Sequence, residues 1–353
     1  MSLLDDTVKG IGPLDRDAMA RAKARLDSLA KPPGSLGRLE ELVERIAGIT
    51  GRDQPALPRK VVVVMAADHG VAAEGVSAYP QSVTPQMVLN FLGGGAAINV
   101  LARQAGARVV VVDMGVAAEL PAQADLVSRR IGPGTANMAK GPAMSREDAI
   151  RAIEEGIRTA EAEHERGLDL VGTGDMGIAN TTPSAAIAAA VTGLPVARLA
   201  GRGTGVDDAG LSRKIAVVER ALEVNRPNRA DPVDVLAKVG GFEIAGLAGV
   251  MLGAAARGVP VVIDGFISGA AALIAAGLAP VVLDRLIAAH VSAEPGHRAV
   301  LDHLGLRPLL SFEMRLGEGT GTALAMLLID AALAIPGGMA TFGEAGVSGR
   351  IGT

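Results

Sequence analysis

Short, mostly apolar runs recur along the chain, and each is followed within three residues by Asp, Gly or Thr. The runs cover residues 61–65, 109–112, 168–171 and 259–263. Strands that are covered on both faces of a sheet typically appear in a sequence as continuous β-branched runs of this length. We therefore predict four buried strands.

Segments of helical character separate or follow these runs, at residues 85–105, 146–167, 211–222 and 244–257. Strands that alternate with helices form parallel sheets with right-handed crossovers. The pattern therefore predicts an α/β protein built on a parallel sheet. Ligands of such sheets bind beyond the carboxyl ends of the strands, where the Asp, Gly and Thr residues gather.

The two ends of the chain have a different pattern. Residues 16–30 and 36–50 are predicted to be helices, joined by a fixed turn at residues 31–35 (KPPGS), because Pro-Pro-Gly cannot continue a helix. A last long helix is predicted from about residue 319 to 335, before a Gly-rich tail.

The composition is that of a globular protein, with 49% hydrophobic and 20% charged residues in a chain of 353. Since there are five Phe, one Tyr and no Trp, small aliphatic side chains must fill the core. The net charge is −4 and the basic residues are scattered, which argues against a nucleic-acid partner. The absence of Cys excludes disulfides, thiolate metal sites and cysteine nucleophiles.

The N-terminal residues are acidic and lack the basic-then-apolar pattern of a signal peptide. Two uncharged stretches, at residues 176–197 and 265–283, are long enough to span a bilayer. They are rich in Ala and Gly, contain Pro and lack aromatic or basic flanks, which favours buried segments. We expect a cytoplasmic protein without a membrane partner.

A G-x-G-x-x-G pattern, Gly172–Gly177, follows the third predicted strand. Glycines at such a turn bring backbone N–H groups close to an anion, so the pattern indicates phosphate binding. A dinucleotide site would also need an acidic residue about twenty residues later. Between Asp175 and Asp207 there is none, which weighs against a nicotinamide-dependent dehydrogenase.

Two more Gly-rich segments lie at residues 201–205 and 317–321. Lys214 follows the first on a predicted helix, where it is either an exposed residue or a phosphate ligand. Glu318 stands between two glycines at the start of the last helix, where a lone Glu often complements the helix dipole. A carboxylate in apolar surroundings can instead act as a base near neutral pH. The five histidines lack the spacing of metal ligands, and only His69, beside Asp68 at the end of a predicted strand, is a candidate for a functional role. We predict neither a metal site nor a cofactor.

Five motifs resemble one family in chain order. They are 31–40 (KPPGSLGRLE), 67–71 (ADHGV), 172–183 (GTGDMGIANTTP), 238–242 (KVGGF) and 315–321 (RLGEGTG). Over nearly the whole chain the sequence resembles nicotinate-nucleotide–dimethylbenzimidazole phosphoribosyltransferases. The resemblance implies a Rossmann-like parallel sheet with helices on both faces, in a homodimer. It divides the chain into a small helical domain (residues 1–58, completed by about 325–353) and a large catalytic domain (residues 59–324).

The resemblance also implies roles for individual residues. Glu318 matches the family's catalytic base. Gly174, Asp175, Met176, Gly177 and Lys214 match positions that bind the phosphate and ribose of the nucleotide. Tyr79, Met87 and Leu316 match the benzimidazole pocket. Members of the family often carry Glu where this chain has Asp175.

The implied reaction moves phosphoribose from nicotinate mononucleotide to a benzimidazole base, in assembly of the lower ligand of cobalamin. The leaving pyridinium is cationic, so it departs without metal activation, and Glu318 takes a proton from the attacking base. A catalytically silent binding protein of the same fold is an alternative, which the joint presence of Glu318 and Lys214 opposes. Transfer from pyrophosphate-activated ribose would need paired acids directly after a strand, whereas Asp207 and Asp208 follow a Gly-rich loop.

Overall fold

The computed structural model describes residues 2–349. Within them, one sheet contains parallel strands in the order β3-β2-β1-β4-β5-β6. The strands are β1 (Lys60–Ala67), β2 (Ala107–Gly115), β3 (Leu126–Ser128), β4 (Leu170–Met176), β5 (Val261–Ile263) and β6 (Leu286–Ala288). This is the order of the doubly wound nucleotide-binding fold, and the predicted α/β class is confirmed. The strand order reverses between β1 and β4, where such folds bind their ligands.

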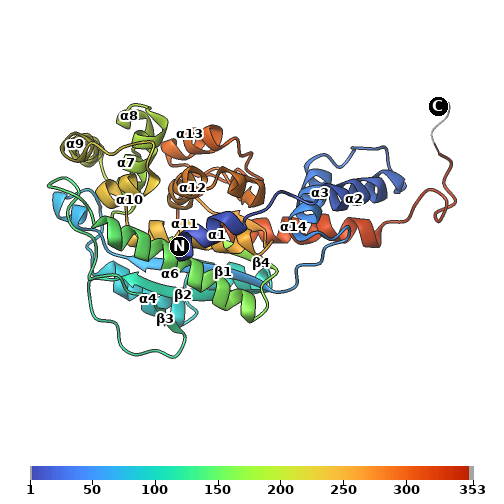
Figure 1. Cartoon of the computed structure of the whole chain (residues 1–353), viewed down its shortest axis with the longest axis horizontal. Coiled ribbons are helices and arrows are strands. Elements are labelled where there is room, and N and C mark those ends of the chain that lie inside the picture. The colour runs from blue at the N-terminus through green and yellow to red at the C-terminus, as the bar shows by residue number, and fades with distance from the viewer. Residues whose placement is uncertain (1, 350–353) are drawn as a thin grey trace.

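Helices cover both faces of this sheet (Figure 1). They are α1 (Leu3–Gly10), α2 (Arg16–Ser28), α3 (Arg38–Thr50), α4 (Val83–Leu92), α5 (Ala97–Gln104), α6 (Arg146–Glu165), α7 (Thr181–Thr192), α8 (Val196–Leu199), α9 (Asp208–Asn225), α10 (Pro232–Val239), α11 (Phe242–Ala256), α12 (Phe266–Leu278), α13 (Pro295–Leu304) and α14 (Thr320–Gly338). Local chemistry fixes several starts. The side chains of Ser145 and Asp207, for example, accept backbone N–H groups in the first turns of α6 and α9.

Successive residues of β1 point to opposite faces of the sheet. Val61, Val63 and Met65 belong to a core shared with α6, α7, α11 and α12. Val62 and Val64 belong to a second core, shared with α2, α3, α5 and α14. Because both faces are buried, the strand has no polar alternation, which is why its sequence is a continuous apolar run.

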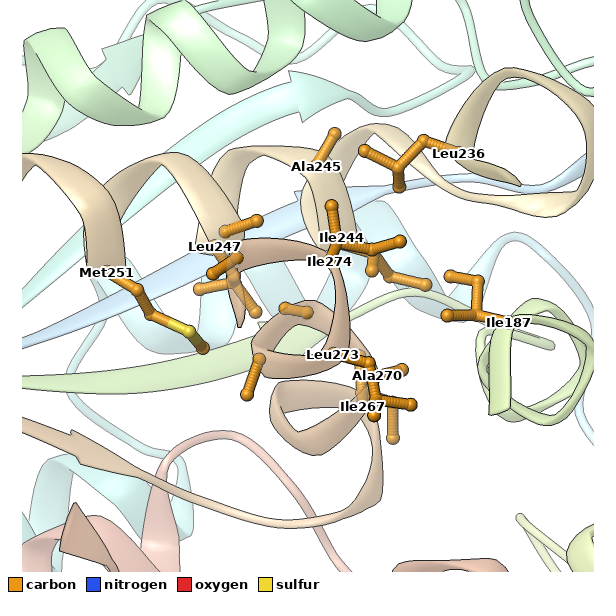
Figure 2. Close-up of a cluster of buried hydrophobic side chains, with 14 of the residues drawn as sticks. Ile187, Leu236, Ile244, Ala245, Leu247, Met251, Ile267, Ala270, Leu273 and Ile274 are labelled. Atoms are coloured by element: carbon orange, nitrogen blue, oxygen red, sulfur yellow. The ribbon is translucent and has the colours of Figure 1, made fainter. Parts of the chain in front are cut away.

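Small and medium aliphatic side chains fill the first core. Figure 2 shows Ile187 of α7, Leu236 of α10, Leu247 of α11 and Leu273 of α12 in one cluster. All four side chains are at most 2% exposed. The two uncharged stretches of the sequence contain α7 and α12, so they are helices of this core, as predicted.

Glycines allow α6 and α11 to pack with their backbones in contact. A Cβ atom on Gly156 of α6 would overlap the carbonyl oxygen of Gly246 in α11, and one on Gly249 would overlap the carbonyl oxygen of Ile153. The scarcity of aromatic residues in the sequence therefore has a structural counterpart in this close contact.

We expect Gly156→Ala to lower the free energy of unfolding by about 1–3 kcal/mol, because the added methyl group cannot be placed without moving a helix. Gly337, near the end of α14, has open space at its Cβ position and is the matched control. Gly337→Ala should change stability by less than about 1 kcal/mol. Denaturant unfolding of both variants measures the difference, and equal stability of the two would contradict the close packing.

Helices α2 and α3 lie beside the last helix, α14, at one end of the molecule (Figure 1). The backbone N–H of Ala30 donates to the carbonyl oxygen of Ala340 at 2.9 Å, and Leu29 pairs with Thr341. Helices α2 and α3 pack here against α14, whereas α1 packs against α6 and α11. The division at residues 58 and about 325 stays a prediction, and residues 1 and 350–353 lie outside the described residues.

The predicted helix at residues 85–105 is wrong as a single element. It is two helices, α4 and α5, separated by three glycines. Gly94 adopts a left-handed φ of 76°, and its N–H donates to Phe91 O at 3.1 Å in a turn that closes α4. This break places the N-terminus of α5 beside the candidate site.

Candidate active site

A cavity of about 560 Å³ lies at the carboxyl edge of the sheet, beyond the ends of β4, β5 and β6. The strand ends, the start of α4, the 203–204 loop and the 315–318 segment form its walls. It is lined by Tyr79, Val83, Met87, Asp175, Met176, Ile178, Asn180, Thr181, Gly203, Thr204, Gly265, Phe266, Ile267, His290, Ser292, Glu294, Arg315, Leu316, Gly317 and Glu318. Six of the nine predicted site residues therefore line one cavity. The other three, Gly174, Gly177 and Lys214, are not part of its lining.

Glu318 is a buried carboxylate on the cavity wall, 6% exposed. Its Oε2 accepts the backbone N–H of Ile98, in the first turn of α5, at 3.4 Å. Burial raises the pKa of Glu318, this hydrogen bond opposes the rise, and the charge of Asp264 adds to it. The result is a carboxylate that is more basic than usual and faces a ligand-sized space.

The backbone around Glu318 has an uncommon conformation. Gly317, Glu318 and Gly319 all have positive φ, at 79°, 63° and 89°. A non-Gly residue adopts this region only where surrounding structure enforces it. The flanking glycines accept the conformation without strain, and they turn the Glu318 side chain into the cavity.

Asp264 fixes the position of this segment. Its carboxylate accepts the N–H groups of Gly319, Gly321 and Thr322 at 2.8–3.2 Å. It therefore caps α14 and complements its dipole, which is the role that the sequence also allowed for Glu318. Since Asp264 performs that role for α14, the Glu318 carboxylate is available to the cavity.

The prediction that the residues from Gly172 to Gly177 form a turn is wrong, whereas phosphate binding by this segment stays a prediction. Gly172 and Gly174 lie within strand β4, which continues to Met176. A Cβ atom on Gly172 would overlap the Thr322 side chain, and one on Gly174 would overlap the Glu318 backbone. These glycines admit α14 and its first turn against the sheet. The dinucleotide interpretation required a glycine-rich turn at these residues, and the strand takes its place.

Asp175 is held at the end of β4 and is 5% exposed. Its Oδ1 accepts Asn180 Nδ2 at 3.0 Å, and its Oδ2 has no partner among residues 2–349. Burial and the nearby Asp264 raise the pKa of Asp175 well above its usual value. Met176 follows it on the same wall.

Lys214 is not an exposed helix residue, because α9 turns it inward to 1% exposure. Its Nζ donates to Thr181 Oγ1 at 2.6 Å and to the Gly201 carbonyl oxygen at 3.1 Å. Burial lowers the pKa of Lys214 to about 8, and the nearby Glu294 opposes this change. The ammonium group lies directly behind Thr181 and Gly203, which line the cavity.

The predicted base-pocket residues form the apolar part of the rim. Tyr79 and Leu316 are 56% and 58% exposed, and Met87 contributes from α4. Large apolar side chains that stay this exposed are candidates for contact with a ligand or another chain. They stand at the mouth of the cavity that contains Glu318.

His69 of one motif meets Glu243, the residue that follows another motif, in a buried hydrogen-bonded pair that sequence reasoning did not find. His69 Nε2 and Glu243 Oε1 lie 2.7 Å apart, and both side chains are at most 1% exposed. A Cβ atom on Gly241 would overlap this pair, and one on Gly177 would overlap the backbone of β1. Gly177 and Gly241 therefore leave room for the pair and for the close approach of the chain.

Sequence reasoning also missed Asp264, His290, Glu294 and Arg315. The position of Asp264, directly after a predicted strand, could have identified it as a site residue. Arg315 Nη1 donates to the Gly203 carbonyl oxygen at 2.8 Å, and Glu294 Oε1 accepts the Gly203 N–H at 2.9 Å. Only the folded chain brings these distant segments together.

Chemically, the cavity combines three elements. It has a basic carboxylate, an apolar rim and a buried ammonium group behind a Gly-rich loop. This set suits a site that binds an anionic group beside an apolar ligand and takes up a proton from one of the bound molecules.

The comparisons with known proteins first define the class. A family model described as phosphoribosyltransferase matches residues 11–347, nearly the whole chain.

The particular family follows from the relatives. Nicotinate-nucleotide–dimethylbenzimidazole phosphoribosyltransferase of Chloroflexus aggregans is 64% identical over 348 residues, covering 99% of both chains. The enzyme of the same name from Roseiflexus sp. is also 64% identical, over 351 residues and 99% of both chains. The crystal structure of CobT from Thermus thermophilus matches with a TM-score of 0.91 at 52% identity, covering 95% of this chain and 100% of that one. The chain belongs to the family of nicotinate-nucleotide–dimethylbenzimidazole phosphoribosyltransferases.

Proposed function

We propose that the protein transfers the 5-phosphoribosyl group from nicotinate mononucleotide to 5,6-dimethylbenzimidazole. The products are α-ribazole 5′-phosphate and nicotinate, in assembly of the lower ligand of cobalamin. The observation that carries the proposal is Glu318, a buried carboxylate of raised pKa in the cavity of a chain of this family.

In the proposed mechanism, Glu318 is the catalytic base. One ring nitrogen of the benzimidazole attacks the anomeric carbon from the face opposite to the pyridinium, and nicotinate leaves with the bonding electrons. The attack inverts the β-linkage to α. The second ring nitrogen becomes acidic as positive charge develops, and its proton passes to Glu318. General base catalysis of this kind contributes typically about a hundred- to ten-thousand-fold.

The other residues position the two substrates. Lys214 places a cation for the 5′-phosphate behind the 201–205 loop, and Asp175 and Met176 face the ribose. Gly174 and Gly177 belong to the same nucleotide-binding wall, where they allow close approach of the backbone. Tyr79, Met87 and Leu316 hold the benzimidazole. Holding two reactants in one geometry accounts for a large part of such rate enhancements.

Product analysis tests the function. The protein is mixed with nicotinate mononucleotide and a panel of bases, which includes dimethylbenzimidazole, adenine and a phenol, and products are identified by mass spectrometry. We expect an α-linked ribotide of dimethylbenzimidazole together with free nicotinate. Release of nicotinate without a base adduct would contradict the transfer.

Excess chelator should leave turnover essentially unchanged. The cationic pyridinium needs no Lewis acid to leave, and residues 2–349 contain no group of three His, Asp or Glu side chains placed to hold a metal ion. Turnover is compared with and without chelator, and then after addition of Mg²⁺. A strict requirement for Mg²⁺ would favour the pyrophosphate-activated alternative.

The same proposal includes a cytoplasmic homodimer without a nucleic-acid or membrane partner. Among the described helices, Thr320–Gly338 is long and apolar enough to cross a membrane. It begins next to Glu318 and packs against β4 and β5, which supports a role as a core helix. The exposed side chains of Leu327 (40%), on this helix, and of Phe312 (62%) are apolar surface that a second subunit can cover.

A further inference from the structure

Two carboxylates of the cavity are incompletely satisfied. Asp175 and Glu294 are each 5% exposed, and each has one oxygen held by a hydrogen bond. The other oxygens, Asp175 Oδ2 and Glu294 Oε2, are buried and have no partner in the described part of the chain. A buried polar atom without a partner is costly, so such an atom in a ligand cavity indicates a donor on the ligand.

The Glu294 side chain is directed at the 201–205 loop and not at its own helix. Glu294 precedes α13, yet its carboxylate makes no capping hydrogen bond there. Oε1 instead accepts the N–H of Gly203, and Oε2 lies so close to Gly201 that a Cβ atom would overlap it. The carboxylate therefore faces the 201–205 loop.

Lys214 contacts the same loop. Its Nζ contacts the Gly201 carbonyl oxygen at 3.1 Å and would lie 3.1 Å from a Cβ atom on Gly203. Within residues 2–349, Glu294 and Lys214 are not joined by an ion pair. The loop thus has a hydrogen-bond acceptor and a cation close to each other, which matches the hydroxyl groups and the phosphate of one ribose phosphate.

We infer that Glu294 binds a ribose hydroxyl of the nucleotide through Oε2, beside the phosphate. This inference rests on the proposed function and deepens it. Glu294 would supply, from a distant segment, the acidic ribose ligand that the sequence lacks after Gly172–Gly177. Asp175 is the poorer acceptor, because burial and the neighbouring Asp264 raise its pKa well above the usual value.

The test compares nicotinate mononucleotide with its 2′-deoxy and 3′-deoxy analogues. With the analogue that lacks the hydroxyl bound by Glu294, the kcat/KM of the wild type should be about ten- to a hundred-fold lower than with the natural substrate. The reason is the loss of one charge-assisted hydrogen bond. Glu294→Ala should lower kcat/KM for the natural substrate by a similar factor, whereas kcat/KM for that analogue should stay nearly the same as in the wild type. Glu294→Gln, which keeps the acceptor for Gly203, should give an intermediate ratio.

Asp175→Asn tests the rival acceptor, the other half-satisfied carboxylate, and should keep the preference for the natural substrate even where it lowers activity toward all three compounds. A purely structural role of Glu294 would lower activity toward all three substrates equally, and an unchanged ratio in Glu294→Ala overturns the inference. Loss of the preference in Asp175→Asn alone overturns it too. Failure of the wild type to convert the natural substrates would instead contradict the proposed function.

Discussion

Glu318→Gln should lower kcat by about a hundred-fold or more while KM for both substrates changes little. The amide keeps the size of the side chain and can still accept the Ile98 N–H, but it cannot take up a proton. The carboxyl must be ionised to act as a base, and its pKa is raised by burial. Wild-type kcat should therefore fall as the pH decreases through that pKa, and the variant should lack this acid limb.

Stability provides the control for this result. If Glu318 only complements the dipole of α5, Glu318→Gln changes the free energy of unfolding by less than about 1 kcal/mol and leaves turnover alone. Turnover and melting temperature measured on the same preparation separate the two roles. A fully active variant would move the base to another residue, with Asp175 the next candidate.

Replacing Lys214 should raise KM for nicotinate mononucleotide about ten- to a hundred-fold, because a charge-assisted contact with the phosphate is lost. Affinity for free dimethylbenzimidazole should stay nearly unchanged. Lys214→Ala tests the whole side chain, and Lys214→Met keeps most of the buried stem without the charge. In the wild type, KM should also rise as the pH increases through the lysine pKa of about 8, where the ammonium loses its proton.

Lys140→Ala is the matched control, because Lys140 is an exposed lysine outside the cavity lining. It should leave KM unchanged. Equal binding of the nucleotide by Lys214→Met and wild type would place the phosphate elsewhere and leave Lys214 a structural residue.

The parts of the fold that could be predicted are those in which one local pattern dominates. The apolar run of β1 and the 20-residue helix α6 are present where the sequence places them. The strands β3 and β6 were missed. They have three residues each, like β5, but β5 lies within the longer apolar run at residues 259–263. The glycines of β4 signal a turn locally, but the close approach of α14 decides their conformation.

The residues of the site divide in the same way, into those that a local motif identifies and those that only the fold brings together. Glu318, Asp175 and the rim residues were found because their motifs resemble a family. Asp264, Glu294 and Arg315 act through backbone groups of segments far away in the chain. Glu294 and Gly203, for example, are 91 positions apart in sequence and are joined by one hydrogen bond. No local pattern contains that information, because it arises only when the strand ends are assembled.

The position of Tyr79 has an optical consequence. It is the single tyrosine of a chain that has no tryptophan, and it stands half-exposed at the rim of the cavity. The intrinsic ultraviolet emission of the protein therefore comes essentially from one side chain at the mouth of the site. A base that stacks on this ring quenches the emission, so ligand occupancy can be followed in the unlabelled wild-type protein, with Tyr79→Phe as the dark reference.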